Sequence, residues 1–293
     1  MRFSKTLFLC IFLATITCCA FVLYERNRYN IVSSKELSSI REKLRILTPQ
    51  EKKDLSVFID EAILFNQYPY TLVGYKPMSV FNFLLDSEDL DVNLRKVYKK
   101  PWHQTMKHGY QVWKKYGSLF TQKKVILTDY YWDKVEGIKE ISLIRLDLCS
   151  SKIEEHLADF CEVLGRSCES SEVLEILTHP ERAEFHQILS RDRLLGILLG
   201  FGRNNAYLYE EYLPQRSLML EDPQSASKDP LASFTNEWPF WPRKWRLPGF
   251  ACNPTTKETK QLKKHYQEAR RIICWTYFGR DDLEVTLALL TQP

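Results

Sequence analysis

The feature that most constrains this chain is a run of nineteen residues without a formal charge near its amino terminus, residues 6–24. Basic residues flank the run on both sides. At about 1.5 Å of rise per residue, a helix of this length reaches roughly 28 Å, close to the hydrocarbon thickness of a bilayer, about 30 Å. The run therefore predicts an N-terminal hydrophobic helix that anchors the chain in a membrane.

Other leaders fit the same residues. A cleaved signal peptide needs a small-x-small cleavage site, of which residues 15–17 are a weak version. In a bacterial lipoprotein signal, Cys18 or Cys19 would carry the lipid, although its neighbours are not the small and polar residues expected there. All three leaders place the chain beyond about residue 28 outside the cytoplasm. A buried core helix is the remaining interpretation, and the terminal position of so long a charge-free run disfavours it.

Composition indicates a folded chain and gives no general argument for a nucleic-acid partner. Apolar side chains make up 44% of the 293 residues and aromatic ones 13%, which is too apolar for a disordered protein. The 41 Lys and Arg stand against 37 Asp and Glu, a formal charge of only +4. We therefore do not expect a nucleic-acid partner, and any basic site must be confined to one part of the chain.

The first part of the body reads as two helices and a turn. Residues 34–47 form a charged amphipathic pattern that predicts a stalk helix. Residues 48–51, Thr-Pro-Gln-Glu, are a capping box that opens a helix to about residue 67. Residues 70–73 are typical of a short strand, and residues 79–85 of a short apolar helix.

The remaining elements are mostly helical. A helix is expected from residue 102 to about 116, and residues 124–132 and 139–146 predict a β-hairpin. Short helices follow between residues 151 and 212, then a proline-rich irregular segment at 214–254 and two closing helices, the first opened by a capping box at 255–258. We expect an α+β protein, mainly α, a compact helical body with a small β-hairpin preceded by the hydrophobic helix. Its predicted divisions are the anchor or signal segment 1–28, the stalk 29–47 and the body 48–293.

A basic stripe is the strongest local charge signal. Residues 92–124 contain nine Lys or Arg and no acidic residue. On a helix, Lys96, Lys100, Lys107 and Lys114 fall along one side and aromatic residues along another. Such a stripe suits anionic lipid or an envelope polyanion, whereas the simpler interpretation is a solvated face whose aromatic residues point into the core. Residues 238–246, with three Trp among Arg and Lys, allow the same two interpretations.

Two segments suggest an anion site. Lys76 stands in a Gly/Pro turn, and Arg203 and Asn204 follow two glycines at a helix break. Together these side chains predict a pocket for a carboxylate or phosphate. The alternative is that they only cap neighbouring helices.

Signatures of metal, nucleotide or covalent chemistry are missing. The sequence has no P-loop, no G-x-G-x-x-G, no G-x-S-x-G, and no Cys/His spacing typical of zinc, so no metal or cofactor is expected. The five body cysteines fit either two bridges with one thiol left over or, as we favour, buried thiols. Cys161 and Cys168 would share a helix face, but Gly165 interrupts the helix between them. These five residues are Cys149, Cys161, Cys168, Cys252 and Cys274.

Three stretches also carry a resemblance: TLVGYKPMS at 71–79, LLGILLGFGRNNA at 194–206, and LPGF at 247–250 with ETKQLKKHYQEAR at 258–270. They resemble recurrent stretches in uncharacterised exported proteins of chlamydiae and related intracellular bacteria. The resemblance implies a bacterial envelope or secreted location. It implies no activity and no catalytic residues.

The sequence therefore predicts a membrane-attached envelope protein that binds a ligand or a protein partner without chemistry of its own. The alternative hypothesis is an enzyme that acts on an anionic substrate through a pocket containing Lys76 and Arg203. The two hypotheses differ in whether these cations converge with an acid or base in one concave site.

Overall fold

The computed structural model describes residues 5–64, 67–84, 101–121, 124–133, 138–212, 247–248, 250 and 252–292. The protein is mainly helical with a small antiparallel sheet, which confirms the α+β, mainly α class. The helices are α1 (Lys5–Tyr29), α2 (Ser34–Leu44), α3 (Pro49–Phe58), η1 (Ile59–Leu64), α4 (Tyr68–Leu72), α6 (Pro101–Tyr116), η2 (Gly117–Leu119), α7 (Leu146–Glu155), α8 (Leu157–Leu164), α9 (Ser170–Thr178), α10 (Ala183–Leu189), α11 (Asp192–Leu198), α12 (Arg203–Tyr212), α14 (Lys257–Tyr277) and α15 (Asp282–Leu290). The strands are β1 (Met78–Leu84), β2 (Val125–Asp133) and β3 (Ile138–Arg145).

The three strands form one antiparallel sheet in the order β1-β3-β2. The predicted hairpin corresponds to β2 and β3, in which Leu127 lies opposite Leu143. On the other side of β3, Phe81 of β1 lies opposite Ile141. The sheet therefore has one more strand than the sequence predicted.

The secondary structure of two neighbouring segments was predicted wrongly. Residues 70–73, predicted as a strand, belong to helix α4, where Pro69 occupies the first turn. Residues 79–85, predicted as a helix, are mostly strand β1. Met78 and Val80 face one hydrophobic cluster and Phe81 faces the other. A strand covered on both faces lacks a strict alternation of apolar and polar residues, so periodicity cannot distinguish it from a short buried helix.

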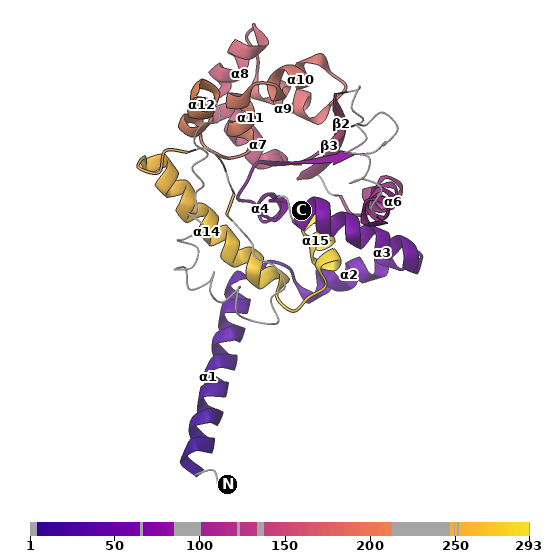
Figure 1. Ribbon diagram of the computed structural model, residues 1–293, viewed down its shortest axis with the longest axis vertical. Coiled ribbons are helices and arrows are strands. Elements are labelled where there is room, and N and C mark those ends of the chain that lie inside the picture. Colours follow the sequence, from indigo (N-terminus) through magenta and orange to yellow (C-terminus); the bar gives the residue numbers. More distant parts are fainter. Residues whose placement is uncertain are drawn as a thin grey trace.

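The sheet separates two hydrophobic clusters (Figure 1). Ile141 and Leu143 of β3 belong to the larger cluster, formed with α2, α3, α4, α6, α14 and α15. Ile144 belongs to the smaller one, formed with α7 to α11. Because side chains of a strand alternate between its two faces, one strand contributes to both clusters.

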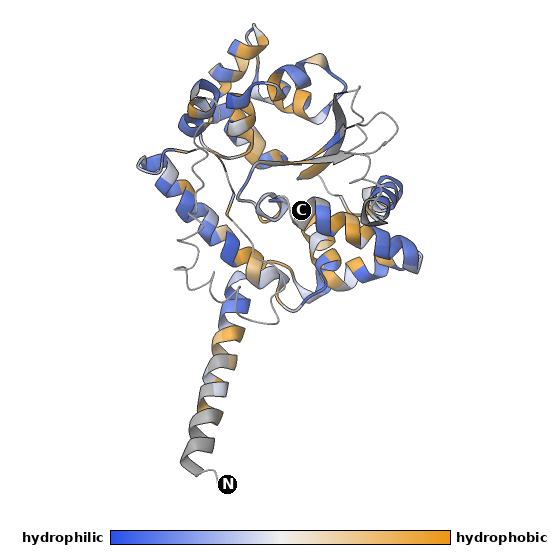
Figure 2. Cartoon of the chain, viewed as in Figure 1, coloured by the Kyte–Doolittle hydropathy of each residue, from blue (hydrophilic) through white to orange (hydrophobic). Residues whose placement is uncertain are grey.

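Helices α1 and α2 of the N-terminal segment meet the body in different ways. Helix α2, expected as a stalk, lies against α15, and its Leu37, Ile40 and Leu44 are buried in the larger cluster. Its apolar stripe thus packs into the body. Helix α1 projects away from the body, and its Phe12 and Phe21 are each more than half exposed (Figures 1 and 2). Within the described residues, no helix has the combined length and apolarity of a membrane span.

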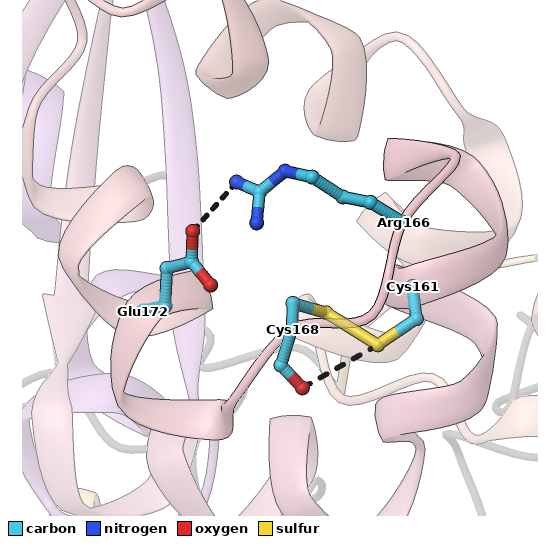
Figure 3. Close-up of a disulfide and its surroundings, with 4 residues drawn as sticks. All are labelled: Cys161, Arg166, Cys168 and Glu172. Carbon is cyan, nitrogen blue, oxygen red and sulfur yellow. Dashed lines mark hydrogen bonds and ion pairs between the residues drawn. A yellow bond between two sulfur atoms is a disulfide. The ribbon is translucent and has the colours of Figure 1, made fainter.

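A disulfide closes the turn after α8 (Figure 3). Gly165 ends the helix with a φ of 67°, and the amide of Arg166 donates to the carbonyl of Cys161 at 3.2 Å, the pattern of a Schellman motif. This reversal brings Cys168 to 5.7 Å from Cys161, measured between Cα atoms, and the two form a bridge. The favoured interpretation of buried thiols was therefore wrong for this pair, because the glycine that interrupts the helix also folds the chain back.

Candidate functional site

A cleft of about 750 Å³ lies between α14 and the smaller cluster. Four segments form its walls: the turn between α4 and β1, helix α7, the loop between α11 and α12, and the N-terminal half of α14. Its lining residues are Gly74, Tyr75, Pro77, Leu148, Ser151, Lys152, Glu155, His156, Ile197, Gly200, Gly202, Arg203, Lys257, Glu258, Gln261, Leu262, His265 and Tyr266. The volume falls in the range of small-molecule sites, roughly 300–1,000 Å³.

Glycines allow the loop after α11 to approach α14 closely. Gly200 and Gly202 have φ angles of 73° and 86°, which L side chains rarely adopt. A Cβ on Gly200 would lie 2.6 Å from the hydroxyl of Tyr266, and this hydroxyl donates to the carbonyl of Gly200 at 2.8 Å. The loop and α14 are therefore held together by a hydrogen bond between the Tyr266 side chain and the Gly200 backbone.

Arg203 reaches the cleft but is held by a carboxylate behind it. Its Nε and Nη2 donate to the two oxygens of Asp159 at 2.8 and 2.9 Å, and the hydroxyl of Tyr207 donates to the same carboxylate at 2.7 Å. These hydrogen bonds lower the pKa of Asp159 and raise that of Arg203. The guanidinium is thus a fixed part of the wall, with its charge balanced within the protein.

Lys76 has the opposite environment. Its side chain is buried, its ammonium donates to Oε1 of Gln67 at 2.7 Å, and it lies 5.3 Å from the centre of the Phe201 ring. Burial beside a neutral acceptor lowers the pKa of Lys76 to about 7. Lys76 is not among the residues that line the cleft.

The third predicted anion ligand, Asn204, is exposed on α12. Its neighbour Asn205 is buried instead, donating to the carbonyl of Phe201 and accepting hydrogen bonds from the amide of Asn253 and the hydroxyl of Thr259. Asn205 therefore ties the loop to the start of α14. The structure does not bring the three predicted side chains to one point in the cleft, and anion binding by them stays a prediction.

The α7 wall carries a second internal ion pair. Lys152 and Glu155 are joined at 2.5 Å, and His156 lies 3.5 Å from the same carboxylate. Burial lowers the pKa of His156, which favours the neutral form of its imidazole. The charges of this wall are mutually balanced, as they are around Arg203.

The start of α14 differs by one residue from the predicted capping box. The N-cap is Thr256, whose hydroxyl accepts from the amide of Thr259 at 3.2 Å, while the hydroxyl of Thr255 donates to Asn253 at 2.7 Å. Glu258, expected to close the box, therefore takes no part in capping and faces Gly202 across the cleft wall. Its Oε2 atom is shielded from solvent and has no hydrogen-bond partner among the described residues.

An aromatic pair lines the outer part of the cleft. The rings of Tyr75 and His265 lie 4.5 Å apart, and Nε2 of His265 is 3.2 Å from the carbonyl oxygen of Tyr75. Glu258, Leu262 and His265 are spaced four and then three residues apart, so they follow one face of α14. Sequence reasoning missed this face, although the spacing was visible.

The basic stripe is partly engaged within the protein. Lys114 forms an ion pair with Asp129 at 2.8 Å, and Lys139 pairs with the same carboxylate. Although burial alone would raise it, hydrogen bonds from these lysines lower the pKa of Asp129 to about 2. Lys107 is half-buried. On the other side of α6, Met106, Tyr110 and Trp113 are buried, as the simpler interpretation predicted.

Other predicted sites lie outside the described residues: Lys96, Lys100, the segment 238–246 and the side chain of Cys18. Cys19 is exposed on α1. In the described ranges, no three His, Cys, Asp or Glu side chains gather as a metal site would require. Comparisons with family models, with curated proteins and with solved structures found no match.

Proposed function

We propose that this chain is a membrane-attached envelope protein whose body binds a small ligand in the cleft between α7, α14 and the loop 200–203, without chemistry of its own. The observation that carries the proposal is the cleft itself. It combines apolar floor residues, an aromatic pair and a few charged groups, which is the usual makeup of a ligand site.

Four observations support membrane attachment through the N-terminal segment and a body outside the cytoplasm. The charge-free run 6–24 is long enough to cross a bilayer, and α1 exposes apolar side chains such as Phe12, Leu13 and Phe21. The Cys161–Cys168 bridge is of a kind that persists mainly in oxidising compartments, which supports a body outside the cytoplasm. The resemblance to exported chlamydial proteins points to the same location.

Binding is favoured over catalysis because the groups suited to chemistry are engaged elsewhere. Arg203 is held by Asp159, and Lys76 is buried against Gln67. His265 contacts a main-chain oxygen of Tyr75, and His156 a carboxylate of the adjoining residue. These contacts hold the walls of a binding site, whereas an acid–base mechanism needs such groups aimed at a shared substrate atom.

The ligand cleft is tested by filling it. Ser151 is exposed on α7 and lines the cleft, whereas Glu154 is exposed on the same helix outside it. Full-length protein in lipid nanodiscs should bind members of a charge-balanced fragment library in ligand-observed NMR, and Ser151→Trp should abolish that binding while Glu154→Trp preserves it. Binding that survives Ser151→Trp would place the ligand site elsewhere.

Membrane attachment is tested by fractionation and by the mass of the mature N-terminus in a bacterial host. The proposal expects the full-length chain in the membrane fraction after carbonate washing, and expects deletion of residues 6–24 to leave the body in the cytosol. Full-length protein recovered from cytosolic fractions with Met1 intact and no lipid attached would contradict the proposal. The measured mass also distinguishes an intact anchor, a cleaved leader and an acylated Cys18 or Cys19.

A further inference from the structure

Some of the charged side chains that line the cleft have a partner of opposite charge, and others do not. Arg203 is paired with Asp159, and Lys152 with Glu155, so these cations are neutralised by acids of their own wall. Lys257 is exposed at the rim, where solvent screens its charge. Glu258 remains: it lines the cleft, and the described residues form no hydrogen bond with its shielded Oε2 atom.

An unpaired, partly shielded carboxylate is costly unless something compensates it. Its position in the first turn of α14 supplies a part of that compensation, because the positive end of the helix dipole attracts a negative charge there. The dipole does not satisfy a shielded oxygen with a hydrogen bond. A positively charged donor bound against this carboxylate in the cleft would do so. The space left by the missing side chain of Gly202 is occupied by the Glu258 carboxyl group itself, whose Cδ lies 2.7 Å from where a Cβ on Gly202 would be.

The neighbours of Glu258 along the helix define the rest of the ligand. Leu262 lies one turn further along α14. His265, whose ring packs against that of Tyr75, lies two turns along, about 10 Å from Glu258 along the helix axis. Apolar and aromatic surfaces of this kind pack against a hydrocarbon or aryl body. The face of α14 therefore presents, in order, a negative charge, an apolar surface and an aromatic end.

We propose that the cleft binds a small organic cation, a protonated amine or guanidinium on an apolar body, with Glu258 as its counter-ion. The inference rests on the proposed function and names the ligand class for the same site. It replaces an anionic ligand with a cationic one, because Arg203 already has an acid partner whereas Glu258 has no basic partner among the described residues. An anionic ligand would lie against Glu258, and of the lysines and arginines that line the cleft only Lys257, exposed at the rim, has no acid partner among the described residues.

The test compares three probes of similar shape and different charge: phenethylamine, the neutral 2-phenylethanol and the anionic 3-phenylpropionate. Binding is measured by NMR titration of the full chain in lipid nanodiscs. The proposal expects phenethylamine to bind at least tenfold more tightly than the alcohol, and 3-phenylpropionate to bind more weakly still. Glu258→Gln should weaken amine binding about tenfold and leave alcohol binding unchanged, while the control Glu154→Gln on α7 should change neither.

The outcomes separate the two proposals. If amine and alcohol bind equally in the cleft, or if Glu258→Gln has no effect, the cation preference is overturned and the ligand cleft stands. If 3-phenylpropionate binds most tightly, the cleft is an anion site and the cation proposal is overturned. If none of the probes, and no fragment of the library, binds in a manner that Ser151→Trp blocks, the ligand cleft itself fails.

Discussion

The fold treats the two cations beside the cleft, Lys76 and Arg203, in opposite ways. Lys76 is almost fully buried and has a neutral amide oxygen as its hydrogen-bond partner. Arg203 is 44% exposed at its side chain and is held by both oxygens of a buried carboxylate. Burial lowers the pKa of the lysine, and the ion pair raises the pKa of the arginine.

The difference shows that a positive residue near a turn does not by itself indicate an anion site. A buried lysine without a carboxylate is a strain on the folded state, and a paired arginine is a structural support. Neither offers a free charge to a ligand. The predictions below test this contrast, beginning with the largest expected effect.

Replacing the buried lysine should stabilise the protein in a pH-dependent way. With a pKa of about 7 in the folded state and about 10.4 unfolded, Lys76 binds its proton less tightly when folded, so its destabilisation is complete below pH 7 and disappears as pH rises toward 10. Lys76→Met should therefore raise the free energy of unfolding by about 3 kcal/mol at pH 6 and by much less at pH 9.5. Urea denaturation at the two pH values measures this difference.

The matched control is Lys257→Met, because this lysine is exposed at the cleft rim. It should change stability little at either pH. A Lys76→Met protein that is equally destabilised at pH 6 and pH 9.5 would show that the lysine contributes by its packing and hydrogen bond, against the contrast drawn above.

Replacing glycines of the loop between α11 and α12 with alanine should lower the free energy of unfolding by amounts that depend on what the added Cβ contacts. Gly200, Gly202 and Gly165 all have positive φ angles, so alanine strains each by about 1 kcal/mol. At Gly200 the new Cβ also lies 2.6 Å from the hydroxyl of Tyr266, which is held by its hydrogen bond. At Gly202 it lies 2.7 Å from the end of the flexible Glu258 side chain. At Gly165 no atom of the described residues beyond its neighbours in the chain lies within 4 Å of it. We expect losses of about 3, 2 and 1 kcal/mol in that order.

Thermal or urea denaturation of the three alanine variants checks the order. Gly165→Ala serves as the control for backbone strain alone. Equal losses at Gly200 and Gly165 would mean that α14 does not press against the loop as the hydrogen bond from Tyr266 indicates.

Neutralising the acid that holds Arg203 should cost less, because the guanidinium is partly solvated. Asp159→Asn keeps the shape and removes the charge, and we expect a loss of about 1–2 kcal/mol at pH 7. The lowered pKa of Asp159 means that its contribution is present above pH 4 and is lost as pH falls through the folded-state pKa. The difference between wild type and Asp159→Asn should therefore shrink in denaturation measured at acidic pH, and a difference that persists there would contradict the ion pair.

The smallest effect is expected at the unpaired acid. Glu258→Gln should change the free energy of unfolding by no more than about 0.5 kcal/mol, since it loses a favourable interaction with the helix dipole and also removes a partly shielded charge, and these two effects oppose each other. Urea denaturation of Glu258→Gln and Asp159→Asn under the same conditions compares the free energy of unfolding lost at each acid. A loss at Glu258 as large as that at Asp159 would reveal a partner in the folded protein and would remove the basis for a cationic ligand.

Local elements were predicted where their signals lie within a few residues. The capping box of Thr48 and Glu51 opens α3 as expected, and the alternating runs beside Gly137 are the paired strands β2 and β3. Prediction was wrong for β1 and α4, because residues buried on both sides carry no period that tells a strand from a helix. It was also wrong by one residue at α14, where Thr255 and Thr256 are both of a residue type that can form an N-cap but Thr256 forms it.

The amino-acid sequence by itself determined the helical class, the hairpin, the caps and the charge-free N-terminal run, since each depends on neighbours along the chain. Only the tertiary structure decided which charges are paired. Asp159 and Arg203 are 44 residues apart, and Lys76, which donates to Gln67 across a turn, lies 5.3 Å from the ring of the distant Phe201. The free energy of a charge depends on its solvent exposure and on its nearest opposite charge in space, and neither quantity is written in the spacing of residues.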